Sequence, residues 1–453
     1  MHYQFKTNMK NILSRFLSAV LFVFITSIAA KAFNPPTQCL VSYELKYTYT
    51  QDSLDRFWKH SHIPQLVVPV RNAVDVYEVV YKGMWLDSTF IIAKGSLYIP
   101  RTNKPAAEMV YDHGTRIRLD QQYGIEDFEQ IVCIMHAADN YIAIFPFYYG
   151  FGGGEKEHVY QDAWTEAMAT IYMIKACREV YPKIGRSTSG QLFLTGYSQG
   201  GHAAMATHKM LESGAFDEIK LTASSPMSGA YDMTGEQTKT MFRNYTQPHY
   251  LPYLIISYQY AYNLWEGDVY DVFKEPYRSR MRQVFAQPRN KDFGDVNAML
   301  PKIPAEMIVD TLLYRFVNDT TFPFTCKLKE NCLCNWVPKA PVQLCACYGD
   351  DEVMVQNTEV AYATMRAKTN VVHKRVFGKY LSHNPCAPFA ILSSKFFFDN
   401  FRKGKKHPER FSLGKKMVLA IGVDIANRQA RAHLKKTGKV EHDALASRKG
   451  KRN

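Results

Sequence analysis

The sequence feature that most constrains this chain is the stretch Gly196-Tyr197-Ser198-Gln199-Gly200-Gly201. Residues 191–195 before it form a short apolar run typical of a buried strand, and residues 202–211 after it are rich in helix formers. A serine that joins a strand to a helix between glycines is typical of a sharp turn, in which the strained serine projects its hydroxyl beyond the sheet. The stretch therefore predicts a nucleophile at Ser198. A serine in an ordinary glycine-rich loop is the alternative.

A serine nucleophile needs a base to accept its proton and an acid to orient that base. His383 is the predicted base, because it follows the predicted last strand at residues 371–376 and directly precedes a helix. Asp350 is the predicted acid, since it is the first acidic residue after the predicted strand at residues 340–348. Asp351, the next residue, is the alternative acid.

The oxygen that becomes negative during attack on a carbonyl needs two preorganised N–H donors. The backbone N–H of Gln199, directly after the nucleophile, is the first predicted donor. The N–H of Thr115 is the second, because it lies in the loop after the predicted strand at residues 107–112. Gly114 would let the backbone approach closely, and the ring of His113 would have a structural role, bonding the neighbouring loop.

From about residue 107 onward, predicted strands alternate with predicted helices. This rhythm predicts an α/β fold with a mostly parallel sheet, helices on both faces and a leading hairpin (residues 74–81 and 89–99) at one edge.

Residues 231–325 are aromatic-rich, helical in places and without a clear strand, so we expect an inserted helical cap over the strand ends. A helical excursion packed beside the sheet is the alternative. The predicted segments are a signal peptide (1–32), the first part of the core (33–230), the cap (231–325), the second part of the core (326–401) and a basic C-terminal tail (402–453).

The first 32 residues have the pattern of a secretory signal peptide. Three basic residues, Lys6, Lys10 and Arg15, precede an apolar run of 15 residues, and Ala30-Lys31-Ala32 is a small-x-small cleavage site. An N-terminal membrane anchor is the alternative, but a span needs about 20 apolar residues. We therefore expect a secreted, periplasmic or cell-envelope protein that begins at Phe33.

The basic charge of the chain is concentrated at its C-terminus. Residues 402–453 contain 16 Lys and Arg and 4 Asp and Glu, a net charge of +12, which leaves only +2 of the total +14 for the remaining residues. One interpretation is a solvated, partly disordered tail. The other is an electrostatic contact with an anionic membrane surface or a polysaccharide. Export and the lack of any recognition motif disfavour nucleic acid as a partner.

The chain has nine cysteines, and export makes disulfides feasible. An odd number leaves at least one thiol unpaired. Because Cys326, Cys332 and Cys334 are close in the sequence, a local bridge among them is the first expectation. No second C-x-x-C pair or histidine pair completes a zinc site there. We predict no metal and no cofactor.

Several motifs together resemble the secreted α/β-hydrolases of Bacteroidetes, relatives of the secretory lipase family. The resemblance covers about residues 40–400 and rests on residues 111–115, 196–202, 223–232 and 336–341. It implies a lipase- or esterase-like activity on an α/β-hydrolase fold, in which the triad follows the chain order Ser, Asp, His. Ser198 and His383 fall where this family keeps its nucleophile and base, and residues 350–353 resemble the D-E-x-V run that its acid opens. In the loop after the fourth strand, Phe147 replaces an acidic residue.

These observations predict a serine hydrolase that cleaves carboxylic esters, either small-molecule or lipid, through an acyl-enzyme on Ser198. The aromatic loop at residues 147–151 and the insert would form an apolar acyl pocket. One alternative keeps the fold and cleaves peptides as an exopeptidase. The other is a non-catalytic binding protein on the same fold. The sequence leaves the acyl and alcohol specificity and the oligomeric state open.

Overall fold

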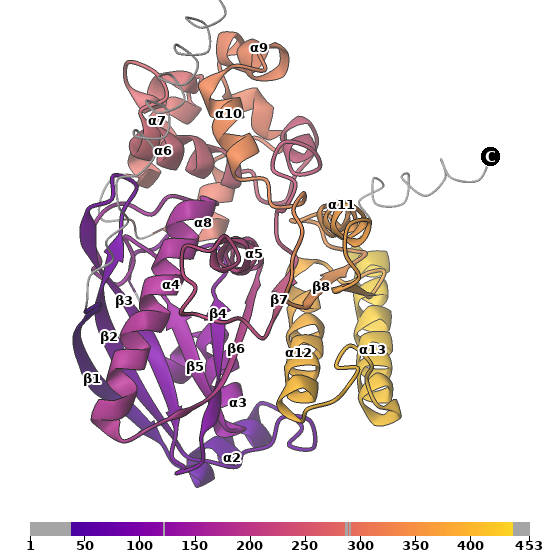
Figure 1. Ribbon diagram of the computed structural model, residues 1–453. Coiled ribbons are helices and arrows are strands. Elements are labelled where there is room, and N and C mark those ends of the chain that lie inside the picture. The colour runs from indigo at the N-terminus through magenta and orange to yellow at the C-terminus, as the bar shows by residue number, and fades with distance from the viewer. Residues whose placement is uncertain (1–37, 121–122, 286–288, 290, 438–453) are drawn as a thin grey trace, which may run out of the picture. The chain divides into compact units, whose positions relative to one another are not determined.

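The computed structural model describes residues 38–120, 123–285, 289 and 291–437. Its centre is a nine-stranded sheet with the order β1-β2-β3-β5-β4-β6-β7-β8-β9 (Figure 1). The strands are β1 (Leu40–Tyr49), β2 (Val74–Met84), β3 (Phe90–Pro100), β4 (Ala106–Asp112), β5 (Tyr141–Pro146), β6 (Thr188–Tyr197), β7 (Ala223–Met227), β8 (Val342–Cys347) and β9 (Val372–Phe377). The predicted signal peptide at residues 1–32 lies outside the described residues.

The part of the sheet from β5 and β4 to β9 is parallel, while β1, β2 and β3 run antiparallel to their neighbours. This confirms the mostly parallel sheet that the sequence predicts. The hairpin of β2 and β3 is not the edge, however, because β1 pairs outside it, with Leu40 opposite Tyr81. Strand β1 was not predicted, although the alternation of Val41, Tyr43, Leu45 and Tyr47 with polar residues is the pattern of a half-exposed strand.

Helices cover both faces of the sheet, as two adjacent residues of β4 demonstrate. Tyr111 points to one face, where its hydroxyl lies 3.4 Å from Oε1 of Glu129 in α3. Asp112 points to the other, where its Oδ1 accepts a hydrogen bond from Thr170 in α4. The helices are α2 (Gln51–His60), α3 (Phe128–Ala138), α4 (Ala163–Val180), α5 (Gln199–Leu211), α6 (Tyr250–Tyr262), α7 (Tyr277–Phe285), α8 (Phe293–Ala298), α9 (Asp310–Asn318), α10 (Pro323–Glu330), α11 (Val355–Arg366), α12 (His383–Arg402) and α13 (Leu413–Thr437).

Local sequence explains where α4, which packs against α5, begins. The side chain of Asp162 accepts a hydrogen bond from the N–H of Thr165 at 2.8 Å, and Glu166 lies in the first turn of α4. Both features stabilise a helix N-terminus, by capping an orphan N–H and by complementing the helix dipole. Most of α4 is buried, because it packs against β2 on one side and α5 on the other.

The described residues between 231 and 325 contain helices, turns and one isolated bridge between Phe273 and Ile308, but no named strand. In Figure 1, helices α6, α7 and α9 gather beyond the carboxyl ends of the parallel strands, where α5 and α12 begin. Side chains of this insert, among them Gln247, Tyr250 and Phe293, line the same cavity as Ser198. The insert therefore contributes directly to the site, and its assignment as a cap remains a prediction.

The basic C-terminal segment is more ordered than expected. Residues 413–437 form the long helix α13, which lies beside α12 in Figure 1. This helix was not predicted from the sequence, and residues 438–453 lie outside the described residues. Within the described ranges, no helix combines the length and apolar character that a membrane span requires.

Candidate active site

Ser198 occupies the sharp turn between β6 and α5 that the sequence predicts. Its backbone has φ 61° and ψ −121°, a conformation that is costly for a residue with a Cβ. The turn is tight because a Cβ on Gly196 would lie 2.2 Å from the carbonyl oxygen of Gly200, and one on Gly200 would lie 1.8 Å from that of Asp112. Only glycine fits these two positions, so the local sequence fixes the strained serine at the end of the strand.

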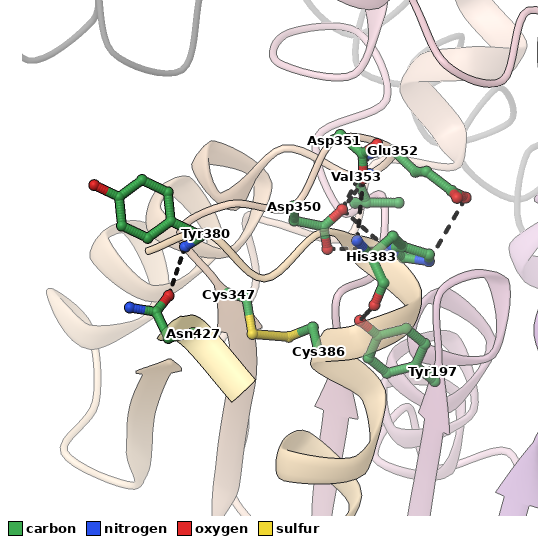
Figure 2. Close-up of a disulfide and its surroundings, with 10 residues drawn as sticks. All are labelled: Tyr197, Cys347, Asp350, Asp351, Glu352, Val353, Tyr380, His383, Cys386 and Asn427. Carbon is green, nitrogen blue, oxygen red and sulfur yellow. Dashed lines mark hydrogen bonds and ion pairs between the residues drawn. A yellow bond between two sulfur atoms is a disulfide. The ribbon is translucent and has the colours of Figure 1, made fainter. Parts of the chain in front are cut away.

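The imidazole of His383 is held by Asp350. Nδ1 of His383 lies 2.9 Å from both carboxylate oxygens of Asp350 (Figure 2). Asp351 instead accepts a hydrogen bond from the backbone N–H of His383 at 3.1 Å. The two candidate acids thus have different positions: Asp350 contacts the ring, and Asp351 contacts the main chain.

The other ring nitrogen of His383 faces the cavity without a hydrogen bond. Nε2 is buried and has no partner in the described part of the chain, so the hydroxyl of Ser198 is not bonded to it here. Both residues nevertheless line the same cavity. In enzymes without substrate, hydrogen bonds between nucleophile and base are often long and tighten only when substrate binds.

A second carboxylate lies near the free nitrogen. Oε2 of Glu352 is 4.0 Å from Nε2 of His383, and Figure 2 shows this side chain pointing toward the ring. Glu352 is fixed by the insert, because its carboxylate accepts hydrogen bonds from Gln247 at 2.9 Å and Tyr250 at 2.7 Å. Burial by itself would lower the pKa of His383, but Asp350 foremost, and then Glu352 and Asp351, raise it to about 9.

Two further contacts hold the base in place. The hydroxyl of Tyr197, the residue before the nucleophile, donates to the carbonyl oxygen of His383 at 2.6 Å. A disulfide joins Cys347, the last residue of β8, to Cys386 in the first turn of α12 (Figure 2). The bridge connects the segment that carries Asp350 to the helix end that carries His383.

The expected local bridge among Cys326, Cys332 and Cys334 is wrong, because all three are free thiols. Each faces a different partner. The thiol of Cys326 lies 3.7 Å from the carbonyl oxygen of Thr320, and that of Cys332 lies 3.3 Å from the hydroxyl of Thr234. Short spacing in the sequence therefore did not bring these sulfur atoms together.

The two predicted N–H donors have no backbone acceptor among the described residues. Gln199 is the first residue of α5, where a backbone N–H has no partner inside the helix. Thr115 lines the cavity with Ser198, and among the described residues its N–H has no acceptor. The N–H of Gly114 is already used, since it donates to Oε1 of Glu129 at 2.7 Å. This leaves Thr115 as the available donor of its loop.

The structural interpretation of His113 is confirmed. Its two ring nitrogens lie 2.7 Å and 3.2 Å from the carbonyl oxygens of Gly114 and Phe147. Burial, with a smaller contribution from Arg116, lowers the pKa of His113 to about 3, so the ring is neutral. The ring connects the loop after β4 to the loop after β5.

Behind the serine lies a buried polar network that the sequence analysis missed. The side-chain amide of Gln199 donates to Oε1 of Glu166 at 2.8 Å and lies 2.7 Å from Nε2 of His158. The other oxygen of Glu166 lies 2.7 Å from Nδ1 of His202. Burial alone would lower the pKa of His202, but Glu166 raises it above its ordinary value. The network ties α4 to the first turn of α5, directly after Ser198.

The cavity has a volume of about 890 Å³ and a mixed lining. Apolar and aromatic walls come from residues on α3, α6, α8 and α12, including Phe128, Tyr250, Phe293 and Ile391. Charged side chains line it too: Arg116, Arg118, Asp120, Asp127, Glu129, Lys291, Asp292 and Glu352.

The expectation that residues 147–151 form the acyl pocket is wrong. The aromatic side chains of this loop are buried in the core and are absent from the lining of the cavity. The ring of Tyr148 lies 4.3 Å from that of His113, and the hydroxyl of Tyr149 donates to the carbonyl oxygen of Met84. The loop thus packs against His113 in the core, whereas residues of the insert do line the cavity.

Within the described residues, no group of three or more His, Cys, Asp and Glu side chains has an arrangement that could hold a metal ion.

Comparisons with known proteins identify the fold. No protein-family profile matches the chain, and no curated protein matches it by sequence. Solved structures do match. A Legionella pneumophila protein assigned as a hydrolase is 22% identical with a TM-score of 0.74, covering 81% of this chain and 99% of that one. The rice cell wall degrading esterase LipA from Xanthomonas oryzae is 25% identical with a TM-score of 0.70, covering 80% and 96%. Candida antarctica lipase A in its closed state is 15% identical with a TM-score of 0.62, covering 89% and 95%.

These likenesses, together with the mostly parallel sheet and the turn at Ser198, show that the chain has the α/β-hydrolase fold. The predicted fold class is confirmed.

Proposed function

We propose that this protein is a serine hydrolase that cleaves carboxylic esters. The observation that carries the proposal is that the strained Ser198 and His383 line one cavity, while Asp350 holds Nδ1 of the same imidazole at 2.9 Å. The structural neighbours support the same class of reaction, because they include an esterase and a lipase.

In the proposed reaction, the hydroxyl oxygen of Ser198 attacks the ester carbonyl while Nε2 of His383 takes its proton. Asp350 accepts the hydrogen bond from Nδ1–H and stabilises the imidazolium. The N–H groups of Gln199 and Thr115 stabilise the negative oxygen of the tetrahedral intermediate. Nε2–H then protonates the leaving alcohol, which leaves an acyl group on Ser198. Water activated by the same imidazole hydrolyses this acyl-enzyme.

A fluorophosphonate probe tests the nucleophile, and a series of p-nitrophenyl esters of increasing acyl length tests the reaction. Ser198→Ala should abolish both labelling and ester hydrolysis. Ser213→Ala, at an exposed serine two residues beyond α5, is the matched control and should behave like the parent. Labelling of the parent that survives in Ser198→Ala would contradict the proposal. Turnover of aminoacyl-anilides in place of esters would assign the chain to the exopeptidases.

We further propose that the protein is exported and begins at Phe33 after cleavage. The signal-like pattern of residues 1–32 supports this, and so does the Cys347–Cys386 disulfide, because such bonds persist mainly in oxidising compartments. N-terminal sequencing of protein recovered from the producing organism tests the cleavage site. A mature chain that still begins at Met1 would refute it.

A further inference from the structure

Helix α13 presents an unusual row of exposed apolar side chains. Leu413, Met417, Ile421 and Ile425 are 74%, 52%, 56% and 52% exposed. They follow one another at intervals of four residues, and side chains with this spacing lie on the same side of a helix. Isolated exposed apolar residues are normal on protein surfaces, but a contiguous row of four indicates an interaction surface. We name Leu413, Met417, Ile421 and Ile425 the apolar row.

The opposite side of α13 is the one that packs against the core. Leu419 is buried, and Gly422 approaches Phe389 of α12 so closely that a Cβ would lie 3.1 Å from its ring. Further along, the side chain of Asn427 accepts a hydrogen bond from the N–H of Tyr380 at 2.7 Å (Figure 2). These contacts fix the rotation of the helix, so the apolar row is turned away from α12 and toward solvent.

Basic residues continue the same side of the helix beyond the apolar row. Arg428 follows Ile425 by three residues and Lys435 follows Arg428 by seven, which keeps both on this side. The whole helix has six Lys and Arg and a single acidic residue, Asp424, whose carboxylate is paired with Arg428 at 2.7 Å. The surface therefore combines an apolar half with a positively charged half.

We propose that this side of α13 docks on an anionic lipid bilayer. Along this side of the helix the apolar side chains are followed by basic ones. Such a combination can hold a helix in the interface of a charged membrane, with the apolar groups among the acyl chains and the cations among the headgroups. Other occupants fit less well. Residues 438–453 contain five Lys and Arg against two acidic residues, and a second copy of α13 carries the same positive charge, so both are repelled by the basic half. The proposal concerns binding and does not depend on the proposed catalytic activity.

The test measures binding of the full chain to vesicles by flotation. One set contains equal parts of phosphatidylglycerol and phosphatidylcholine, and the other contains phosphatidylcholine alone. The apolar variant combines Met417→Ser, Ile421→Ser and Ile425→Ser, and the charge variant combines Arg428→Gln, Lys435→Gln and Lys436→Gln. A control variant combines Tyr314→Ser and Val317→Ser, which are similarly exposed but lie on α9, outside the proposed surface. Far-UV circular dichroism and thermal unfolding establish that each variant is folded.

The parent and the control variant should bind the anionic vesicles at least tenfold more tightly than the neutral ones. The apolar variant should lose at least tenfold in affinity. Because each basic residue near an anionic surface strengthens binding about fivefold, the charge variant should bind far more weakly and respond less to salt.

Equal binding of parent and apolar variant to anionic vesicles would overturn the proposal, as would equal binding of the parent to both vesicle types. The first result would assign membrane binding to another segment, and the second would show that the charge of the lipid does not determine binding. A parent that sediments as a dimer without vesicles, and an apolar variant that is monomeric, would identify a second copy as the occupant and also overturn it.

Discussion

The carboxylate of Glu352 gives a prediction that depends on one distance. Glu352→Gln removes a negative charge 4.0 Å from Nε2 of His383 and keeps the size of the side chain and an oxygen that can accept from Tyr250 or Gln247. Because a nearby negative charge favours the imidazolium, the substitution should lower the pKa of His383. His383 acts as a base only when neutral. The variant should therefore reach full activity at lower pH than the parent.

The size of the shift follows from Coulomb's law. Two unit charges about 4 Å apart at an effective dielectric constant of about 20 attract by about 4 kcal/mol, or about 3 pKa units. Both charges are delocalised, over two oxygens and two nitrogens, and 4.0 Å is their shortest separation. We therefore expect a decrease of about 1 to 2 pKa units.

The assay is the pH dependence of kcat/KM for a soluble p-nitrophenyl ester, since this parameter reports the pKa values of the free enzyme. The acid limb of the parent should have its midpoint well above 6.5, in the direction of the value of about 9 for His383. Asp351→Asn is the control, because its side chain contacts the backbone N–H of His383 and its charge contributes less. An acid limb that stays in place in Glu352→Gln, or moves to higher pH, would refute the reasoning.

Three other predictions concern the geometry of the site. Asp350→Asn should lower kcat about 10³- to 10⁴-fold, because an amide favours the wrong imidazole tautomer. Asp351→Asn should lower kcat less than tenfold. Steady-state kinetics of both variants on one ester test this, and a loss in Asp351→Asn as large as that in Asp350→Asn would contradict the assignment of Asp350. Replacing Cys347 and Cys386 by serine opens a link between residues 39 apart, so the free energy of unfolding in denaturant should fall by about 4 kcal/mol, and an unchanged value would contradict the chain-entropy argument. Gly200→Ala places a Cβ 1.8 Å from the carbonyl oxygen of Asp112, so fluorophosphonate labelling of Ser198 should be lost, and a fully labelled variant would show that the turn can open.

Local signals were enough to select the candidate residues of the site from the sequence. Ser198, Asp350 and His383 each follow a short apolar strand, and a parallel sheet brings the carboxyl ends of its strands to one edge. The choice between Asp350 and Asp351 is different, because it depends on which side chain the turn after β8 points at the ring. Two adjacent acidic residues carry no sequence signal for that direction.

Contacts between segments that are far apart in the sequence could not be predicted either, because no local sequence signal indicates which side chains will meet. Glu352 meets Gln247 and Tyr250 across about a hundred residues of chain, and Cys347 meets Cys386 only because β8 ends beside the start of α12. The aromatic loop after β5 led to a wrong prediction, because aromatic residues suit a pocket wall and a packed core equally well. In the structure the loop packs against His113 and belongs to the core.

Because of the Cys347–Cys386 bridge, how firmly the proposed site is held depends on the redox conditions of the compartment in which the chain folds. Thiols stay reduced in the cytosol and pair in oxidising compartments. Until these two sulfur atoms join, only packing and hydrogen bonds keep the segments of Asp350 and His383 together. In a reducing compartment the two segments would therefore lack this covalent link, and in an oxidising one the bond would hold them together.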